Sequence, residues 1–186
     1  MEYQDLNPGD SQYPKRLIER MGDEAPRLYY NGPLKLLDRF SMAVICADMI
    51  PGLCMYETND MLFEIREWAL NYIGGWHAVM ETEIFRLALY RKNDPEGLRS
   101  ATLISARGLA RENWDTFLAD RFGYSGPFTD FPEKPEYYRR AEAGELLMLS
   151  ITEPNFKRFL TKNIMARNWG ACALAAVGFI PFAEKG

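Results

Sequence analysis

A run of basic residues near the C-terminus carries the clearest chemistry in this sequence. The stretch NFKRFLTKNIMARN, from Asn155 to Asn168, contains four basic residues and no acidic one: Lys157, Arg158, Lys162 and Arg167. The apolar spacing predicts a helix over 156–174, on which Arg158 and Lys162 share a face and could contact neighbouring phosphates. The N–H groups of its first turn would add to that attraction. A solvated basic face without a ligand explains the same pattern.

Three other residues could contact a ligand. His77 is the only histidine, and at a predicted helix start it could bind a ligand and titrate near neutrality, or it could simply cap or pack. Arg107 follows a predicted buried strand, where it could hold a phosphate bidentately or form an ordinary salt bridge. Glu81 and Glu83 point to different helix faces, so they do not form a catalytic carboxylate pair.

These residues are positioned by strands and helices that alternate along the chain. Apolar runs predict strands at 27–32, 41–47, 100–106, 145–150 and 175–183. Amphipathic spacing predicts helices at about 57–73, from about 78, at about 114–121 and at 156–174, the first of them ended by Gly74-Gly75. The alternation predicts a single Rossmann-like, doubly wound α/β domain with a mostly parallel sheet and helices on both faces. Such sheets bind ligands at the carboxyl ends of their strands.

One segment interrupts this alternation. FGYSGPFTDFPEKPEYYRR, residues 122–140, holds three prolines, two glycines and many aromatic residues. Its composition predicts a long connection attached to the surface by its rings. A lid, a partner surface and a packed excursion remain alternative roles for it.

Composition excludes several classes of protein. The 186 residues suit one domain, and the net charge of −4 argues against generic coating of nucleic acid. The acidic N-terminus MEYQDLNPGD is unlike a signal peptide, and no apolar run approaches the roughly 18–20 residues of a membrane helix. Three cysteines without a CxxC pair predict neither a disulfide framework nor a metal site, and reduced thiols indicate the cytoplasm.

Three segments, in order, resemble the DNA-processing protein A (DprA/Smf) family of the wider DprA/LOG Rossmann-like group. LLMLSITEPNFKRFLTKNIMARNWGACALAA is similar to that family's strand ending in Ser, its Pro-containing loop and the Arg-Asn that opens a small apolar run. YPKRLIERMGDEAPRLYYNGPLKLLDRFSMAVICA resembles the start of its nucleotide-binding-like fold, and GGWHAVMETEIFRLAL resembles its Gly, His and acidic helix start. Matching positions are Gly75, His77, Glu81, Ser150, Pro154, Arg158, Arg167 and Asn168.

The resemblance implies a lead-in over residues 1–26 followed by a Rossmann domain over 27–186 that holds single-stranded DNA or a nucleotide. It implies a role in DNA processing or recombination without a cofactor, and it leaves a homodimer open. Backbone contacts of this kind give affinity without reading sequence. Together with Arg107, the expected binding residues are Gly75, His77, Glu81, Arg107, Ser150, Arg158, Lys162, Arg167 and Asn168.

The sequence also departs from the family. After the first buried strand the family has Gly-Ser-Arg, whereas this chain has Cys46-Ala47-Asp48, and an aspartate repels phosphate. Cys46 is expected to behave as a small apolar residue. The Pro-Gly-Gly-x-Gly-Thr-x-x-Glu run of phosphoribohydrolases is absent, and no C-terminal winged helix is predicted.

Three hypotheses follow. The first is a non-catalytic module that binds DNA or a nucleotide through the strand ends and the basic helix. The second is an enzyme or sensor for a nucleotide-derived small molecule, with Glu81, His77 and Arg107 around its pocket. The third is a family member that acts only through protein partners, which the altered turn at Cys46-Ala47-Asp48 favours.

Overall fold

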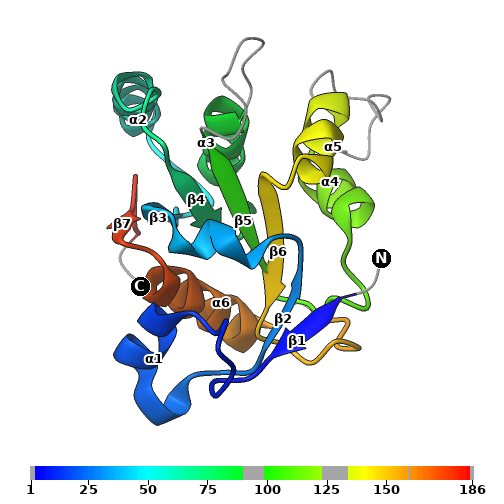
Figure 1. Ribbon diagram of the computed structural model, residues 1–186. Coiled ribbons are helices and arrows are strands. Elements are labelled where there is room, and N and C mark those ends of the chain that lie inside the picture. Colours follow the sequence, from blue (N-terminus) through cyan, green and yellow to red (C-terminus); the bar gives the residue numbers. More distant parts are fainter. Residues whose placement is uncertain (1–2, 90–98, 123–133, 159, 185–186) are drawn as a thin grey trace.

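The fold is built on one seven-stranded sheet (Figure 1). A computed structural model describes residues 3–89, 99–122, 134–158 and 160–184. The strand order is β1-β2-β6-β5-β4-β3-β7. The strands are β1 (Gln4–Leu6), β2 (Leu28–Asn31), β3 (Ser41–Val44), β4 (Asn71–Gly74), β5 (Ser100–Ser105), β6 (Leu146–Ser150) and β7 (Val177–Phe179).

Five neighbouring strands form the parallel part of the sheet. β6, β5, β4, β3 and β7 pair in parallel, with Gly74 of β4 opposite Val44 of β3 and Leu103 of β5. β2 pairs antiparallel with β6, and β1 pairs antiparallel with β2. The carboxyl ends of the five parallel strands therefore lie along one edge, which we call the strand-end edge.

Helices cover both faces of this sheet, as the sequence predicts (Figure 1). Alternate strand residues divide between two apolar clusters, since Tyr72 and Leu103 belong to one and Ile73 and Ile104 to the other. The first cluster includes residues of α2 (Gly52–Glu64), α3 (Val79–Leu89), α4 (Trp114–Phe122) and α5 (Lys134–Glu142). The second includes residues of α1 (Lys15–Met21), the 3-10 helix η2 (Leu34–Asp38) and α6 (Thr161–Leu174).

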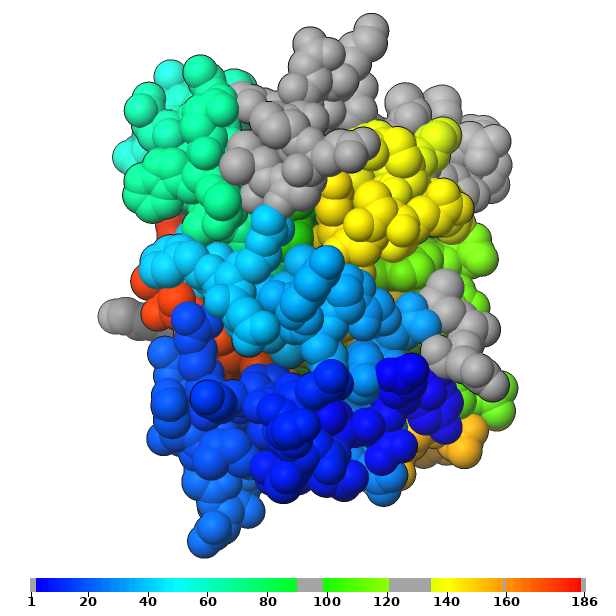
Figure 2. Space-filling model, in the orientation of Figure 1, coloured from blue at the N-terminus to red at the C-terminus, as the bar shows by residue number. Residues whose placement is uncertain are grey.

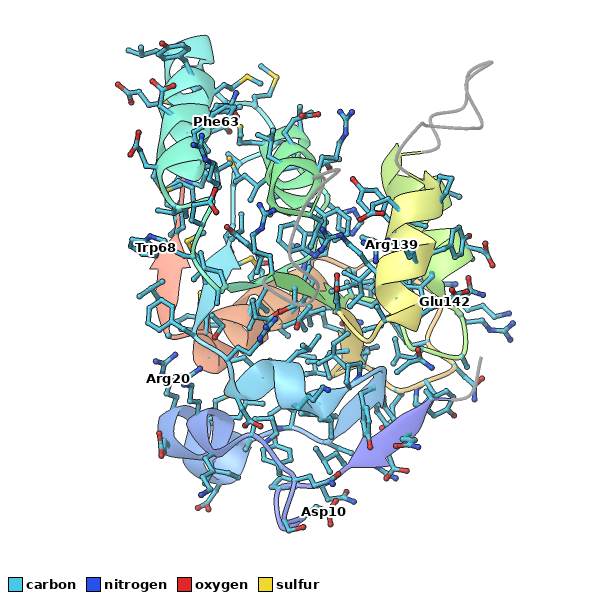
Figure 3. The ribbon with its side chains drawn as sticks, turned by 45° about the horizontal axis from the view of Figure 1, so that its top comes forward. Asp10, Arg20, Phe63, Trp68, Arg139 and Glu142 are labelled. Atoms are coloured by element: carbon cyan, nitrogen blue, oxygen red, sulfur yellow. The ribbon has the colours of Figure 1, made fainter. Side chains whose placement is uncertain are left out.

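The N-terminal segment contributes to the same structure. β1 is one of the two edge strands of the sheet. Helix α1 packs against α6 and is followed by a short 3-10 helix, η1 (Gly22–Glu24), which leads toward β2. Arg20 of α1 donates hydrogen bonds from Nη1 to the carbonyl oxygens of Cys172 and Ala175, each at 2.6 Å, at the end of α6 (Figure 3). A cation at this position compensates the partial negative charge of the helix C-terminus.

Two of the predicted helices have wrong boundaries. The helix predicted to run to residue 73 ends at Glu64, and Asn71–Gly74 form β4 instead. The amide of Asn71 is buried and bonded to Thr102 and Ser100 of the neighbouring strand, which makes a polar residue stable inside the sheet. The C-terminal helix begins at Thr161 rather than at 156, so residues 156–158 belong to a loop.

The predicted connection over 122–140 is partly helical. α5 begins at Lys134, and its Tyr137 is buried with its ring centroid 5.1 Å from that of Phe85. Residues 123–133, the remainder of that prediction, lie outside the described residues.

Candidate functional site

The strand-end edge brings together most of the residues predicted to bind a ligand. Gly75 and His77 follow β4, Arg107 follows β5, and Ser150 ends β6. The first half of α6 reaches this edge, since Asn163 donates from Nδ2 to the carbonyl oxygen of Ala106 at 3.4 Å. Some side chains at this edge are buried and bonded to the protein, whereas others are exposed.

Glu81 is a buried carboxylate that joins two strand-end loops. Its Oε1 accepts a hydrogen bond from the backbone N–H of Cys46 at 3.0 Å, and its Oε2 accepts one from His77 at 2.9 Å. The side chain is only 3% exposed, and burial raises the pKa of its carboxyl group, opposed by those backbone N–H donors and by the charge of Arg167. An internal carboxylate thus occupies one backbone N–H group of the loop after β3 and one of the loop after β4.

Arg167 is a buried cation held against the backbone of Gly75. A Cβ atom on Gly75 would lie 2.1 Å from both Cζ and Nη1 of Arg167, so any other residue there would force the guanidinium to move. Its Nε and Nη2 donate to Oδ1 of Asn168 at 3.1 and 2.9 Å, while no described residue accepts a hydrogen bond from Nη1. Burial lowers the pKa of Arg167, and the charge of Glu81 opposes that shift.

The turn between Gly75 and His77 has an unusual backbone. Trp76 is completely buried with a φ of 58°, in the left-handed region that a bulky side chain rarely adopts. Its indole Nε1 has no acceptor among the described residues. His77, the next residue, is exposed at the start of the helix that carries Glu81.

Arg107 and Ser150 lie at the strand-end edge, and their side chains form ion pairs or hydrogen bonds within the protein. Arg107 donates from Nε to Glu112 at 3.1 Å and also pairs with Asp120, so the structure shows the salt-bridge alternative for this residue. The hydroxyl of Ser150 donates to the carbonyl of Arg107 at 2.8 Å and accepts from the N–H of Thr152 at 3.0 Å. Both residues tie the β5 and β6 loops together.

Arg158 and Lys162 do not share a helical face. Arg158 lies in the loop before α6, Lys162 lies in the first turn of α6, and both are exposed. The loop is held by backbone hydrogen bonds, from Gly108 N to Phe156 O at 2.9 Å and from Ala110 N to Pro154 O at 3.0 Å. These bonds explain why residues 156–158 leave the helix that their sequence predicts.

The exposed cations of this region form a group that we call the basic rim: Arg111, Lys157, Arg158 and Lys162. No described carboxylate forms an ion pair with any of the four. Arg111 was not among the predicted residues, and the hydrogen bond of its neighbour Ala110 to Pro154 brings it to the loop. The sequence feature that could have identified Arg111 is its position four residues after Arg107, just beyond a predicted buried strand.

An enzyme pocket around Glu81, His77 and Arg107 stays a prediction. Two cavities lined by described residues lie elsewhere, one of about 750 Å³ near α1 and η2 and one of about 200 Å³ between α2 and α3. Across the described part of the chain, no three His, Cys, Asp or Glu side chains are grouped as a metal would require. Nor does any helix in those residues have the length and apolar character needed to cross a bilayer.

The sheet order and the parallel crossovers define a Rossmann-like α/β domain. This fold is similar to that of part of DNA processing protein A, DprA. DprA from Streptococcus pneumoniae superposes with a TM-score of 0.67 at 18% identity, over 97% of this chain and 54% of that one. DprA from Helicobacter pylori, whose structure addresses its single-stranded DNA binding mode, superposes with a TM-score of 0.59 at 18% identity, over 97% of this chain and 69% of that one.

The similarity of this chain to DprA is more evident in the structures than in the amino-acid sequences. No protein-family model matches this chain, and no curated protein matches it significantly. The chain spans about half the length of the pneumococcal protein, 54%. The fold predicted from the sequence, and the resemblance to DprA at the level of fold, are therefore confirmed.

Proposed function

We propose that this chain binds single-stranded DNA through the basic rim, without reading its sequence. The observation that carries the proposal is the set of exposed cations Arg111, Lys157, Arg158 and Lys162, none paired with a described carboxylate, in a protein of net charge −4. Unpaired cations gathered on one edge attract a phosphate backbone and release its counterions on binding. The single-stranded DNA binding of the Helicobacter pylori neighbour, which shares this fold, supports the same ligand.

The proposed role of the buried residues is to hold the rim in place. Glu81 fixes the loops after β3 and β4, and Arg107 and Ser150 fix those after β5 and β6. Arg167 and Asn168 connect α6 to the β4 turn at Gly75. Direct phosphate contacts then come from the exposed cations, and the exposed His77 after β4 is proposed as a further contact. A function in DNA processing or recombination and a homodimeric assembly extend the same proposal.

The test is the affinity for a fluorescently labelled oligothymidylate, measured by anisotropy across a salt series. Arg158→Ala with Lys162→Ala is expected to weaken binding about tenfold at low salt, which corresponds to roughly 1.4 kcal/mol. Because each single-strand phosphate contact contributes about 0.7 to the slope of log affinity against log salt, the double variant should lower that slope by about 1.4.

A charge-matched control comes from the opposite edge of the sheet. Lys15→Ala with Lys35→Ala also removes two positive charges, both exposed, one in α1 and one in η2. This control should retain the affinity and the salt slope of the wild type. Equal losses in both double variants would indicate a general charge effect, and undetectable binding of the wild type at low salt would refute the proposal.

A further inference from the structure

A concave surface lies at the opposite edge of the sheet from the basic rim. It is a cavity of about 750 Å³ between the start of α1, the end of β2 with the turn that follows it, the helix η2 and the end of α6. Figure 2 shows this face of the molecule, with the deep-blue N-terminal residues next to the lighter blue residues that follow β2. A volume of this order is typical of small-molecule sites, which occupy about 300–1,000 Å³.

Positive charge predominates in the cavity lining. Lys15, Arg16 and Lys35 line it together with a single carboxylate, Asp38. Within the described residues, none of these four side chains forms an ion pair. Three cations against one carboxylate leave an excess of positive charge around the cavity, and an anion placed among the cations reduces their mutual repulsion.

Arg16 is the fixed member of this group. It is half-buried, and its Nη1 donates to Oγ of Ser41 at 3.2 Å and to the carbonyl oxygen of Leu174 at 3.4 Å. No described residue accepts a hydrogen bond from its other two nitrogens. A guanidinium anchored through one nitrogen can present the others to a phosphate as a planar, pre-positioned donor.

Capping of α6 does not by itself account for Arg16. Arg20 already donates to the carbonyls of Cys172 and Ala175 at 2.6 Å, which are shorter contacts than the 3.4 Å bond of Arg16 to Leu174. The cavity also has apolar walls, since buried Tyr13, Leu37 and Leu174 line it. The hydroxyl of Tyr13 donates to the carbonyl of Pro26 at 2.6 Å, which fixes the ring.

We propose that this cavity binds a mononucleotide-sized organic phosphate, with Arg16, Lys15 and Lys35 around the phosphate. Tyr13, Leu37 and Leu174 would surround the organic body of the ligand, and the carboxylate of Asp38 accepts a hydrogen bond from a hydroxyl or amino group on it. This site is separate from the basic rim, because Ser41 is the first residue of β3 and the cavity therefore lies at the amino ends of the parallel strands.

The experiment is isothermal titration of the whole chain with adenosine monophosphate, adenosine and inorganic phosphate. Adenosine monophosphate is expected to bind at least tenfold more tightly than adenosine or inorganic phosphate, because only it carries both a phosphate group and a nucleoside. Lys15→Ala with Lys35→Ala should weaken that binding at least tenfold. Both side chains are exposed, so the variant should keep the Tm of the wild type.

The matched control separates this site from the DNA surface. Arg158→Ala with Lys162→Ala should leave binding of adenosine monophosphate unchanged while it weakens binding of oligothymidylate. A variant of Arg16, Arg16→Gln, should reduce nucleotide affinity in the same direction as the lysine variant. The proposal is overturned if adenosine monophosphate does not bind at millimolar concentration, if inorganic phosphate binds as tightly, or if only the rim variant loses nucleotide binding.

Discussion

Replacing Gly108 by alanine is expected to lower the free energy of unfolding by about 3 kcal/mol or more. A Cβ atom at this position would lie 2.0 Å from the carbonyl oxygen of Glu153 and 2.2 Å from that of Pro154. Both obstacles are backbone atoms, and the hydrogen bonds from Gly108 N to Phe156 O and from Ala110 N to Pro154 O hold this backbone in place. The loop can therefore move only by losing those bonds. Urea unfolding followed by circular dichroism measures the change.

The same substitution should also weaken DNA binding, because the displaced loop carries Lys157 and Arg158 of the basic rim. Gly178→Ala is the control, since nothing lies within 4 Å of a Cβ at that position in β7. Its urea midpoint is expected to stay near that of the wild type. A Gly108→Ala protein with the wild-type midpoint would show that the close approach between these two loops is not a constraint on the fold.

The sequence predicts the sheet well where its strands are continuous apolar runs. The segments at Ser41, Ser100 and Glu145 all coincide with observed strands, because parallel strands covered on both faces are apolar throughout. β4 was not predicted, because it is four residues long, begins with Asn71 and ends in glycine, and so has no continuous apolar run. Its polar residue is accommodated by Ser100 and Thr102 on the neighbouring strand, and that pairing is visible only in three dimensions.

The sequence predicts which residues lie at the strand-end edge, but it does not predict most of the contacts that their side chains make. Residue order placed Gly75, Arg107 and Ser150 at one edge, since the ends of parallel strands must meet there. Sequence could not show that Glu112 and Asp120 pair with Arg107, nor that the side chain of Arg167 lies against Gly75. These contacts join segments far apart in the chain or depend on how a loop folds back, so no local pattern encodes them.

Glu81 is expected to be the most important buried polar residue at the strand-end edge. Glu81→Ala removes the acceptor for the N–H groups of Cys46 and His77 and leaves the buried charge of Arg167 without its nearby opposite charge. Because each unsatisfied N–H group costs about 1–3 kcal/mol when buried and these two are partly buried, the expected loss is about 3 kcal/mol. Glu81→Gln keeps one acceptor oxygen and should lose about 1 kcal/mol.

Glu83→Ala on the same helix is the matched control. Glu83 forms an exposed pair with Arg86 at 2.8 Å, and such pairs contribute about 0–1 kcal/mol. Chemical unfolding of the three variants should therefore rank them with Glu81→Ala least stable, then Glu81→Gln, then Glu83→Ala. Equal stabilities for Glu81→Ala and Glu83→Ala would mean that the carboxylate does not hold the two loops together.

The pH dependence of stability tests the charge of Glu81 separately from its hydrogen bonds. Burial raises the pKa of the Glu81 carboxyl above its ordinary value of 4.5, so the folded chain binds this proton more readily than the unfolded chain. The contribution of Glu81 to stability is then greatest below pH 4.5 and declines as pH rises through the raised folded-state pKa. Glu81→Gln cannot titrate, so its stability relative to the wild type should improve as pH rises from 4.5 to the raised folded-state pKa and stay constant above it. Unfolding curves at several pH values measure this difference, and a difference that changes in the opposite direction would show that the N–H donors and Arg167 outweigh burial at this carboxylate.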